Sequence, residues 1–176
     1  MNLVMIGYRC TGKSTVGRRL AARLKMRFVD TDDLIEERQR TSVRDMVKAR
    51  GWDYFRALEK QVIAEISTDD GLVIALGGGA VLDPQNVMAV KKNGLLIWLK
   101  ADSKTLLRRM NEDSRTFSQR PTLTGWGASE EIEEVIATRE PFYQRASEFC
   151  FDTSALDVEA VVEKILPIFR EKGERV

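Results

Sequence analysis

A glycine-rich segment near the N-terminus carries the strongest chemical signature in the sequence. The pattern G-x-x-x-x-G-K-[ST] is filled by Gly7, Gly12, Lys13 and Ser14. Glycines in this pattern free backbone N–H groups to surround phosphate oxygens at the start of a helix, while the lysine reaches the β- and γ-phosphates and the hydroxyl ligates Mg²⁺. The segment therefore predicts ATP binding, through Gly7, Cys10, Thr11, Gly12, Lys13, Ser14 and Thr15. We expect Cys10 to fill space in this loop rather than to act as a nucleophile.

Carboxylates follow the next short apolar run, which covers residues 27–29. Asp30 and Asp32 are two residues apart, so they project in similar directions if the chain is still extended there. One carboxylate would then lie near Mg²⁺ and the other near an acceptor hydroxyl, where it could take up a proton. The alternative is that the polar residues of this segment, Thr31 and Asp33 included, only cap a helix.

Two further segments predict contacts with a small acidic substrate. Arg56 and Glu59 are spaced by one helical turn, so they could pair with each other and grip a carboxylate and a hydroxyl. A surface salt bridge explains the same spacing. The run Gly77, Gly78 and Gly79 follows a buried strand type at 72–76, and its conformational cost favours close backbone contact with a ligand.

Arginines from later segments could complete the site. Residues 111–128 lack periodicity and are rich in turn formers, as a mobile lid would be, and they include Arg120. Arg139 follows in the next helical stretch. Each is a surface arginine by default, but together they supply the positive charge that phosphoryl transfer requires.

The elements that would position these residues alternate along the chain. Short apolar runs occur at 3–6, 27–29, 72–76, 95–99 and 149–151, and helical patterns follow all of them but the one at 72–76. This alternation predicts an α/β fold of three layers, with a five-stranded parallel sheet covered on both faces. Gly51 is expected to interrupt one helical stretch. We expect a single domain over 1–176, with a substrate-binding region at about 31–62 and the lid at about 111–128.

Composition excludes several classes of function. The net charge is +1, so the chain lacks the basic excess expected of a protein that holds nucleic acid by phosphate neutralisation. It has no histidine, which excludes a His-based triad and leaves acid–base work to carboxylates or lysine. The first strand leaves no room for a signal peptide, and no apolar run is long enough for a membrane span. We therefore expect a cytoplasmic enzyme without a membrane or nucleic-acid partner.

The ordered set G-x-x-x-x-G-K-S-T, D-T-D, F-R-x-x-E, G-G-G-A, R-P and R-x-P-x-Y resembles the shikimate kinase family, within the nucleoside monophosphate kinase-like P-loop class. The resemblance spans the whole chain. It implies the strand order 2-3-1-4-5, and transfer of the γ-phosphate of ATP, with Mg²⁺, to the 3-hydroxyl of shikimate.

The same resemblance implies roles for individual residues. Ser14 would ligate Mg²⁺ and Asp30 would lie near it through water, whereas Asp32 would be the base. The shikimate contacts implied are Asp32, Arg56, Glu59, Gly77, Gly78, Gly79 and Arg139. Arg109 and the segment after Thr153 would flank the adenine. Arg120 would close onto the phosphates together with Lys13, but the lid reads R-P-T-L where the family commonly has R-P-L-L, and Arg115 is a second candidate.

Two alternative functions remain open from the sequence. A kinase for another small hydroxy acid, such as gluconate, would share the P-loop and the lid and differ only in the acceptor pocket. A non-catalytic ATP-binding protein would keep the P-loop without turnover, which the joint presence of Lys13, Asp30, Asp32 and Arg120 disfavours. No heptad or exposed apolar stripe stands out, and we expect a monomer.

Overall fold

A parallel five-stranded sheet forms the centre of the fold, in a computed structural model that describes residues 1–112 and 128–173. The strand order is β2-β3-β1-β4-β5. The strands are β1 (Asn2–Ile6), β2 (Arg27–Asp30), β3 (Leu72–Ala75), β4 (Gly94–Lys100) and β5 (Phe149–Asp152). The predicted fold class and strand order are confirmed, and every strand ends within one residue of its expected position.

Helices connect the strands and cover the sheet. They are α1 (Lys13–Leu24), α2 (Thr31–Gln39), α3 (Val43–Ile66), α4 (Pro84–Lys91), α5 (Ser103–Glu112), α7 (Ala128–Ala146) and α8 (Val158–Gly173), with the short 3-10 helix η1 (Ala80–Leu82). Gly51 has φ 82° and ψ 171°, so it divides α3 into two helical halves, as the sequence predicts. The helix α4 was missed, although Asp83 caps it and Pro84 opens it.

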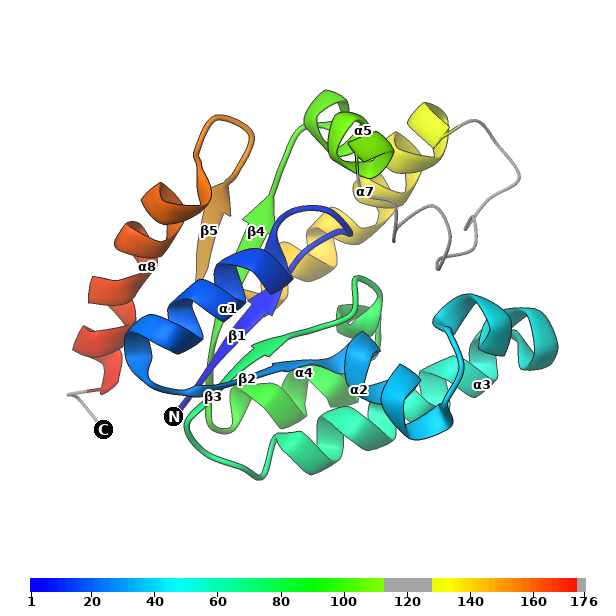
Figure 1. The fold of residues 1–176 in the computed structure, drawn as a ribbon, viewed down its shortest axis with the longest axis horizontal. Helices are drawn as coiled ribbons and strands as arrows, with labels where there is room; N and C mark the ends of the chain where they lie inside the picture. The colour runs from blue at the N-terminus through cyan, green and yellow to red at the C-terminus, as the bar shows by residue number, and fades with distance from the viewer. Residues whose placement is uncertain (113–127, 174–176) are drawn as a thin grey trace.

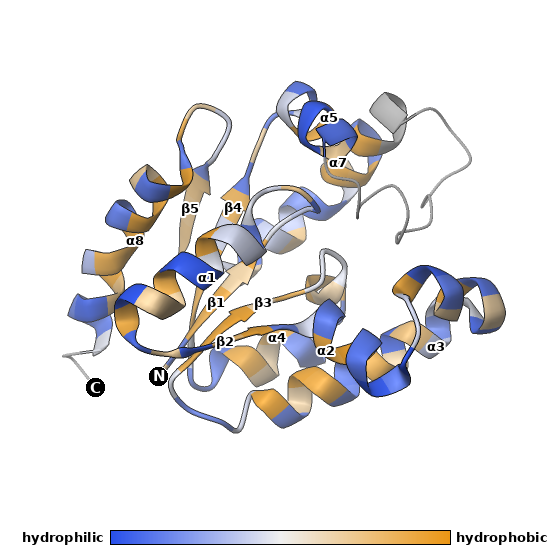
Figure 2. Cartoon of the chain, in the orientation of Figure 1, coloured by the Kyte–Doolittle hydropathy of each residue, from blue (hydrophilic) through white to orange (hydrophobic). Residues whose placement is uncertain are grey.

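The strand side chains alternate between two apolar layers. Leu3 and Met5 of β1 pack with α1 and α8, whereas Val4 and Ile6 pack on the opposite face with α3, α4 and α7. Figure 1 shows these helices on the two sides of the sheet, and Figure 2 shows apolar strands with polar outer helix faces. Within the described part of the chain, no helix has the length and apolar character needed to cross a membrane.

The parallel arrangement brings the carboxyl ends of all five strands to one edge of the sheet. The loop after β1, the start of α2, the glycine run after β3 and the loop after β5 therefore lie at the same edge (Figure 1). Helices α5 and α7 cover this end through a third apolar cluster, which includes Tyr8, Leu106 and Ile132. Ligands of open parallel sheets bind at such an edge.

Candidate active site

The loop between β1 and α1 has the backbone geometry of a phosphate-binding loop. Gly7 and Gly12 have φ of 141° and 97°, in the region that favours glycine, and Cys10 also has a positive φ of 61°. A Cβ on Gly7 would collide with the carbonyl oxygen of Leu99 in β4. Helix α1 starts at Lys13 without an acidic residue in its first turn, so its amino end stays favourable for an anion.

Lys13 is folded into this loop. Its Nζ donates hydrogen bonds to the carbonyl oxygens of Gly7 at 2.8 Å and Tyr8 at 2.7 Å. The side chain is buried, so these bonds compensate for its loss of hydration. An ammonium group has three N–H donors, and the two bonds to the loop hold it beside the bend where phosphates would lie.

Asp30 joins the P-loop helix to the second helix. Its Oδ2 accepts a hydrogen bond from Ser14 Oγ at 2.6 Å, and its Oδ1 accepts from the backbone N–H of Asp32 at 3.0 Å and of Asp33. Asp30 is therefore the N-cap of α2. The expectation that Asp30 and Asp32 project together from an extended chain is wrong, because α2 begins at Thr31 and Asp32 lies in its first turn.

A cavity beside the P-loop gathers the predicted acceptor residues. It holds about 490 Å³ of space, including its open mouth. All of the substrate-contacting residues expected from the sequence line it, namely Asp32, Arg56, Glu59, Gly77, Gly78, Gly79 and Arg139. They come from α2, α3, the loop after β3 and α7, so only the folded chain brings them together.

Two carboxylates converge on Gly77 within this cavity. A Cβ on Gly77 would lie 2.6 Å from both Asp32 Oδ1 and Glu59 Oε1, so any side chain there would force these carboxylates to shift. The requirement for glycine therefore comes from close approach and not from a positive φ. The Gly77 N–H donates to Thr31 Oγ1 at 2.9 Å, and this bond fixes the run to the start of α2.

Glu59 has an unusual electrostatic position. It is 1% exposed and accepts a hydrogen bond from Arg56 Nη1 at 2.6 Å. Burial raises the pKa of Glu59 to about 7, although Arg56 lowers it; Asp32 adds a smaller increase and Arg139 a smaller decrease. The pair is thus no exposed surface salt bridge, which was the alternative explanation for the spacing of Arg56 and Glu59.

Aromatic rings and a third arginine complete the cavity, and sequence reasoning missed them. The guanidinium of Arg56 lies 5.3 Å from the ring centroids of both Trp52 and Phe55. Arg9 lines the same cavity, although it occupies a variable position of the P-loop pattern. No signal in the sequence pointed to Arg9, because the pattern does not reveal where a variable side chain points.

A second cavity lies on the other side of the P-loop. It is open and holds about 1000 Å³, and its lining includes the predicted nucleotide contacts Cys10, Thr11, Gly12, Thr15 and Arg109. Arg109 of α5 donates to Cys10 O at 3.2 Å, and to Thr153 through Oγ1 at 3.0 Å and the carbonyl oxygen at 2.6 Å. The loop after β5 is thereby tied to the P-loop.

The predicted lid lies mostly in the part of the chain that the structure does not describe. Residues 113–127 lie outside the described residues, so Arg115 and Arg120 have no described position. The ends of the predicted segment are helical, because α5 continues to Glu112 and α7 begins at Ala128. Helix α7 also continues through Pro141.

Comparison with known proteins gives a consistent result. The sequence profile described as "Shikimate kinase" matches residues 9–170. A protein named shikimate kinase from Syntrophus aciditrophicus is 40% identical, with 97% of this chain and 92% of the relative covered. A solved shikimate kinase from Acinetobacter baumannii, in complex with shikimate, has a TM-score of 0.89 at 26% identity, covering 97% of this chain and 93% of that one.

A solved gluconokinase from Sinorhizobium meliloti is more distant. It has a TM-score of 0.55 at 15% identity, with 99% of this chain and 94% of that chain covered, so it shows a shared fold only. The profile match covers most of the present chain, and its relatives align over nearly their full length. The chain belongs to the shikimate kinase family.

Proposed function

We propose that this protein transfers the γ-phosphoryl group of ATP to the 3-hydroxyl of shikimate, giving shikimate 3-phosphate and ADP. The observation that carries the proposal is the single cavity that unites Asp32, the glycine run and the arginines next to the P-loop. The family membership supports the same reaction. A carboxylate and neighbouring hydroxyls on one small molecule match this combination of cations and acceptors.

The residues of the chain would divide the reaction between them. Arg56 and Arg139 would bind the shikimate carboxylate, and Glu59 would keep the guanidinium of Arg56 in place. Asp32 would accept the proton of the 3-hydroxyl. At the same time the oxygen of that hydroxyl would bond to the γ-phosphorus, and the bond between the γ-phosphorus and the β–γ bridging oxygen would break. Lys13 and the P-loop amides would hold the phosphates, and Arg120 would add positive charge from the lid.

The residues around Ser14 fit a magnesium ion. Mg²⁺ takes oxygen ligands, often one or two carboxylates together with phosphate oxygens and water. The Ser14 hydroxyl and the Asp30 carboxylate are hydrogen-bonded to each other beside the P-loop, so they supply such oxygens. Ser14 would hold the ion directly and Asp30 through water, and a bound ion would supply positive charge against the phosphate oxygens.

We further propose that the protein acts in the cytoplasm, as a monomer, without nucleic acid or a membrane. The formal net charge of +1 supports the absence of nucleic acid. We also propose a single domain over 1–176, because both cavities lie at one edge of the same sheet.

An ADP-release assay across acceptors tests the function. Purified protein with Mg-ATP is given shikimate, gluconate or a nucleoside in parallel, and ADP formation is followed. Turnover with shikimate far above the other two acceptors is expected. Faster turnover with gluconate would favour the alternative kinase, and ATP binding without turnover on any acceptor would indicate a non-catalytic protein.

A further inference from the structure

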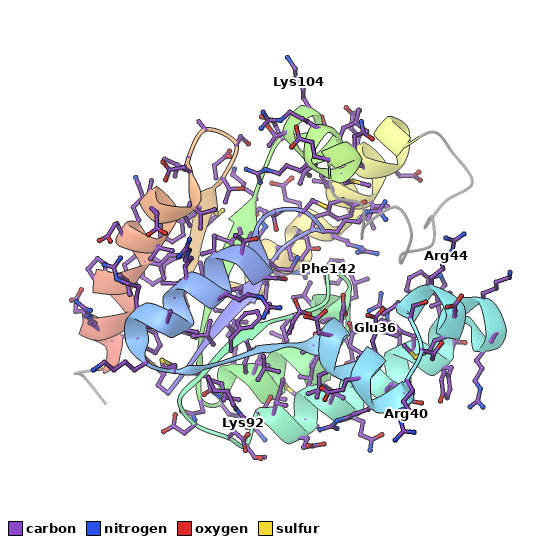
Figure 3. The ribbon with its side chains drawn as sticks, in the orientation of Figure 1. Glu36, Arg40, Arg44, Lys92, Lys104 and Phe142 are labelled. Carbon is purple, nitrogen blue, oxygen red and sulfur yellow. The ribbon has the colours of Figure 1, made fainter. Side chains whose placement is uncertain are left out.

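The last motif of the sequence, R-x-P-x-Y, contains a residue to which the proposed reaction gives no role. Tyr143 lies four residues after Arg139 on α7, so both side chains leave the same face of that helix. Tyr143 is 2% exposed, and its ring stacks on Trp98 of β4 with centroids 5.8 Å apart and an interplanar angle of 23°. Its neighbour Phe142, labelled in Figure 3, is partly buried against the same core.

The hydroxyl of Tyr143 reaches the glycine run. It donates a hydrogen bond to the carbonyl oxygen of Gly78 at 2.6 Å. Burial raises the pKa of Tyr143 to about 12, although Arg139 lowers it, so the phenol remains protonated near neutral pH and can act as the donor. This bond links α7 directly to the segment that lines the acceptor cavity.

The other backbone N–H and C=O groups of the glycine run differ in whether they are hydrogen-bonded. The carbonyl oxygens of Gly77 and Gly79 accept from Ala80 N and Leu82 N, and the Gly77 N–H donates to Thr31 Oγ1. Among the described residues, no acceptor is present for the backbone N–H groups of Gly78 and Gly79. These two donors belong to a segment that lines the cavity and are available to a ligand.

The planarity of the peptide connects the Tyr143 bond to one of these donors. The carbonyl of Gly78 and the N–H of Gly79 belong to the same peptide unit, and in a trans peptide they point in opposite directions. A glycine run offers little steric resistance to rotation of such a unit. A hydrogen bond that holds the carbonyl therefore also fixes the direction of the Gly79 N–H.

We propose that Tyr143 is a positioning residue, which orients the Gly78–Gly79 peptide so that its amide donates to an oxygen of the acceptor. Helix α7 would thus supply Arg139 and also orient the backbone donors of the glycine run. The two lie close together, because a Cβ on Gly78 would be 3.7 Å from Arg139 Nη1. The identity of the acceptor rests on the proposed function. The role of Tyr143 rests on the hydrogen bond, the stacked ring and the two available amides.

The main test is the variant Tyr143→Phe, which keeps the ring and removes only the hydroxyl. We expect the KM for shikimate to rise about tenfold, as the loss of one well-placed hydrogen bond would produce, while the KM for ATP stays within about twofold. Assays are run well below the thermal midpoint of every variant. A shikimate KM equal to the wild-type value would overturn the positioning role.

A control separates positioning from general stability. Ile165→Val removes one methylene from the core on the opposite face of the sheet, and such a loss also lowers stability. This variant should lower the thermal midpoint and leave the shikimate KM unchanged. If Ile165→Val raises the shikimate KM as much as Tyr143→Phe does, the effect is one of stability and the proposal fails.

A measurement on the unaltered protein covers the case in which Tyr143→Phe does not fold. Amide chemical shifts of Gly78 and Gly79 are followed by NMR during titration with shikimate. The Gly79 amide should show one of the largest shifts, and no change there would contradict the proposal. Absence of both turnover and binding with shikimate would reject the proposed function, whereas turnover without a Gly79 response would reject only the role of Tyr143.

Discussion

Glu59 lies buried beneath Arg56, with Oε2 2.6 Å from Arg56 Nη1, while its other oxygen approaches Gly77 from the same side as Asp32 Oδ1. Within the described residues Oε1 has no hydrogen-bond donor. A buried carboxylate with one strong partner and a second carboxylate nearby is costly to ionise. Burial raises the pKa of Glu59 to about 7; Arg56 and Arg139 offset this increase only in part, and Asp32 adds to it.

The raised pKa of Glu59 predicts a pH-dependent stability. The group has an ordinary pKa of 4.5 and one of about 7 in the folded chain, so the fold favours its protonated form. That contribution is complete below pH 4.5 and is lost as the pH rises to about 7. Urea unfolding from pH 4.5 to 8 should show the wild type losing about 3 kcal/mol relative to Glu59→Gln. Parallel pH profiles for the two proteins would contradict it.

Arg56→Ala should separate the two substrates kinetically. The substitution removes a proposed cation for the acceptor carboxylate, so the shikimate KM should rise by roughly 10- to 100-fold while the ATP KM changes little. Steady-state kinetics with each substrate varied in turn measures this. Arg44→Ala is the matched control, because Arg44 is exposed on α3 and does not line the cavity (Figure 3). An increase confined to the ATP KM would refute the acceptor pocket.

Asp32→Asn tests the proposed base. An amide keeps the size of the side chain and cannot accept the hydroxyl proton, so kcat should fall by roughly 10²- to 10⁴-fold with ATP affinity largely intact. The neighbouring Asp33→Asn is the control, because Asp33 is 55% exposed and pairs with Arg18 at 3.2 Å. It should retain nearly full turnover. Comparable kcat values for Asp32→Asn and the wild type would rule out the assignment.

Adjacent glycines should respond differently to alanine. At Gly77 the new methyl would lie 2.6 Å from two carboxylate oxygens, whereas at Gly78 the nearest atom is 3.5 Å away. Gly77→Ala should therefore lower the free energy of unfolding by about 1–3 kcal/mol, and Gly78→Ala should stay within about 0.5 kcal/mol. Denaturant titration measures both. Equal losses would mean that the crowding around Gly77 does not limit stability.

Local patterns accounted for the P-loop, the strands and most of the helices, although not for α4. A run such as 3–6, followed by glycines and a helical period, contains within a few residues the information that fixes strand, loop and helix. The acceptor residues were also identifiable, but only as separate segments. Their meeting in one cavity follows from the strand order, which places the ends of β2 and β3 side by side.

The directions of individual side chains were harder to predict from the sequence. The sequence placed Asp30 and Asp32 on one extended segment, but the cap formed by Asp30 starts α2 one residue later and turns Asp32 with the helix. Arg9 and Tyr143 were missed as contributors for a similar reason. The direction of each side chain depends on segments that are distant in sequence: the ring of Tyr143 stacks on Trp98 of β4, and Arg9 lines a cavity together with arginines of α3 and α7. Such long-range packing leaves no local signal.

Thr153→Val should raise the KM for ATP and leave the KM for shikimate unchanged. Thr153 is 3% exposed, and its Oγ1 lies 3.1 Å from Thr11 O while accepting from Arg109 at 3.0 Å. Valine keeps the shape and removes these bonds, so the ATP KM should rise by about two- to tenfold with the shikimate KM unchanged.

The control for this substitution is Thr138→Val. Thr138 is exposed on α7, and among the described residues its hydroxyl bonds only to Glu134 O of its own helix, at 2.9 Å. Thr138→Val therefore makes the same chemical change without removing the hydrogen bonds that link the P-loop to the loop after β5. If Thr153→Val raised the shikimate KM and left the ATP KM unchanged, the second cavity would not be the nucleotide site. The opposite responses of Thr153→Val and Arg56→Ala would instead place the two substrates on opposite sides of the P-loop.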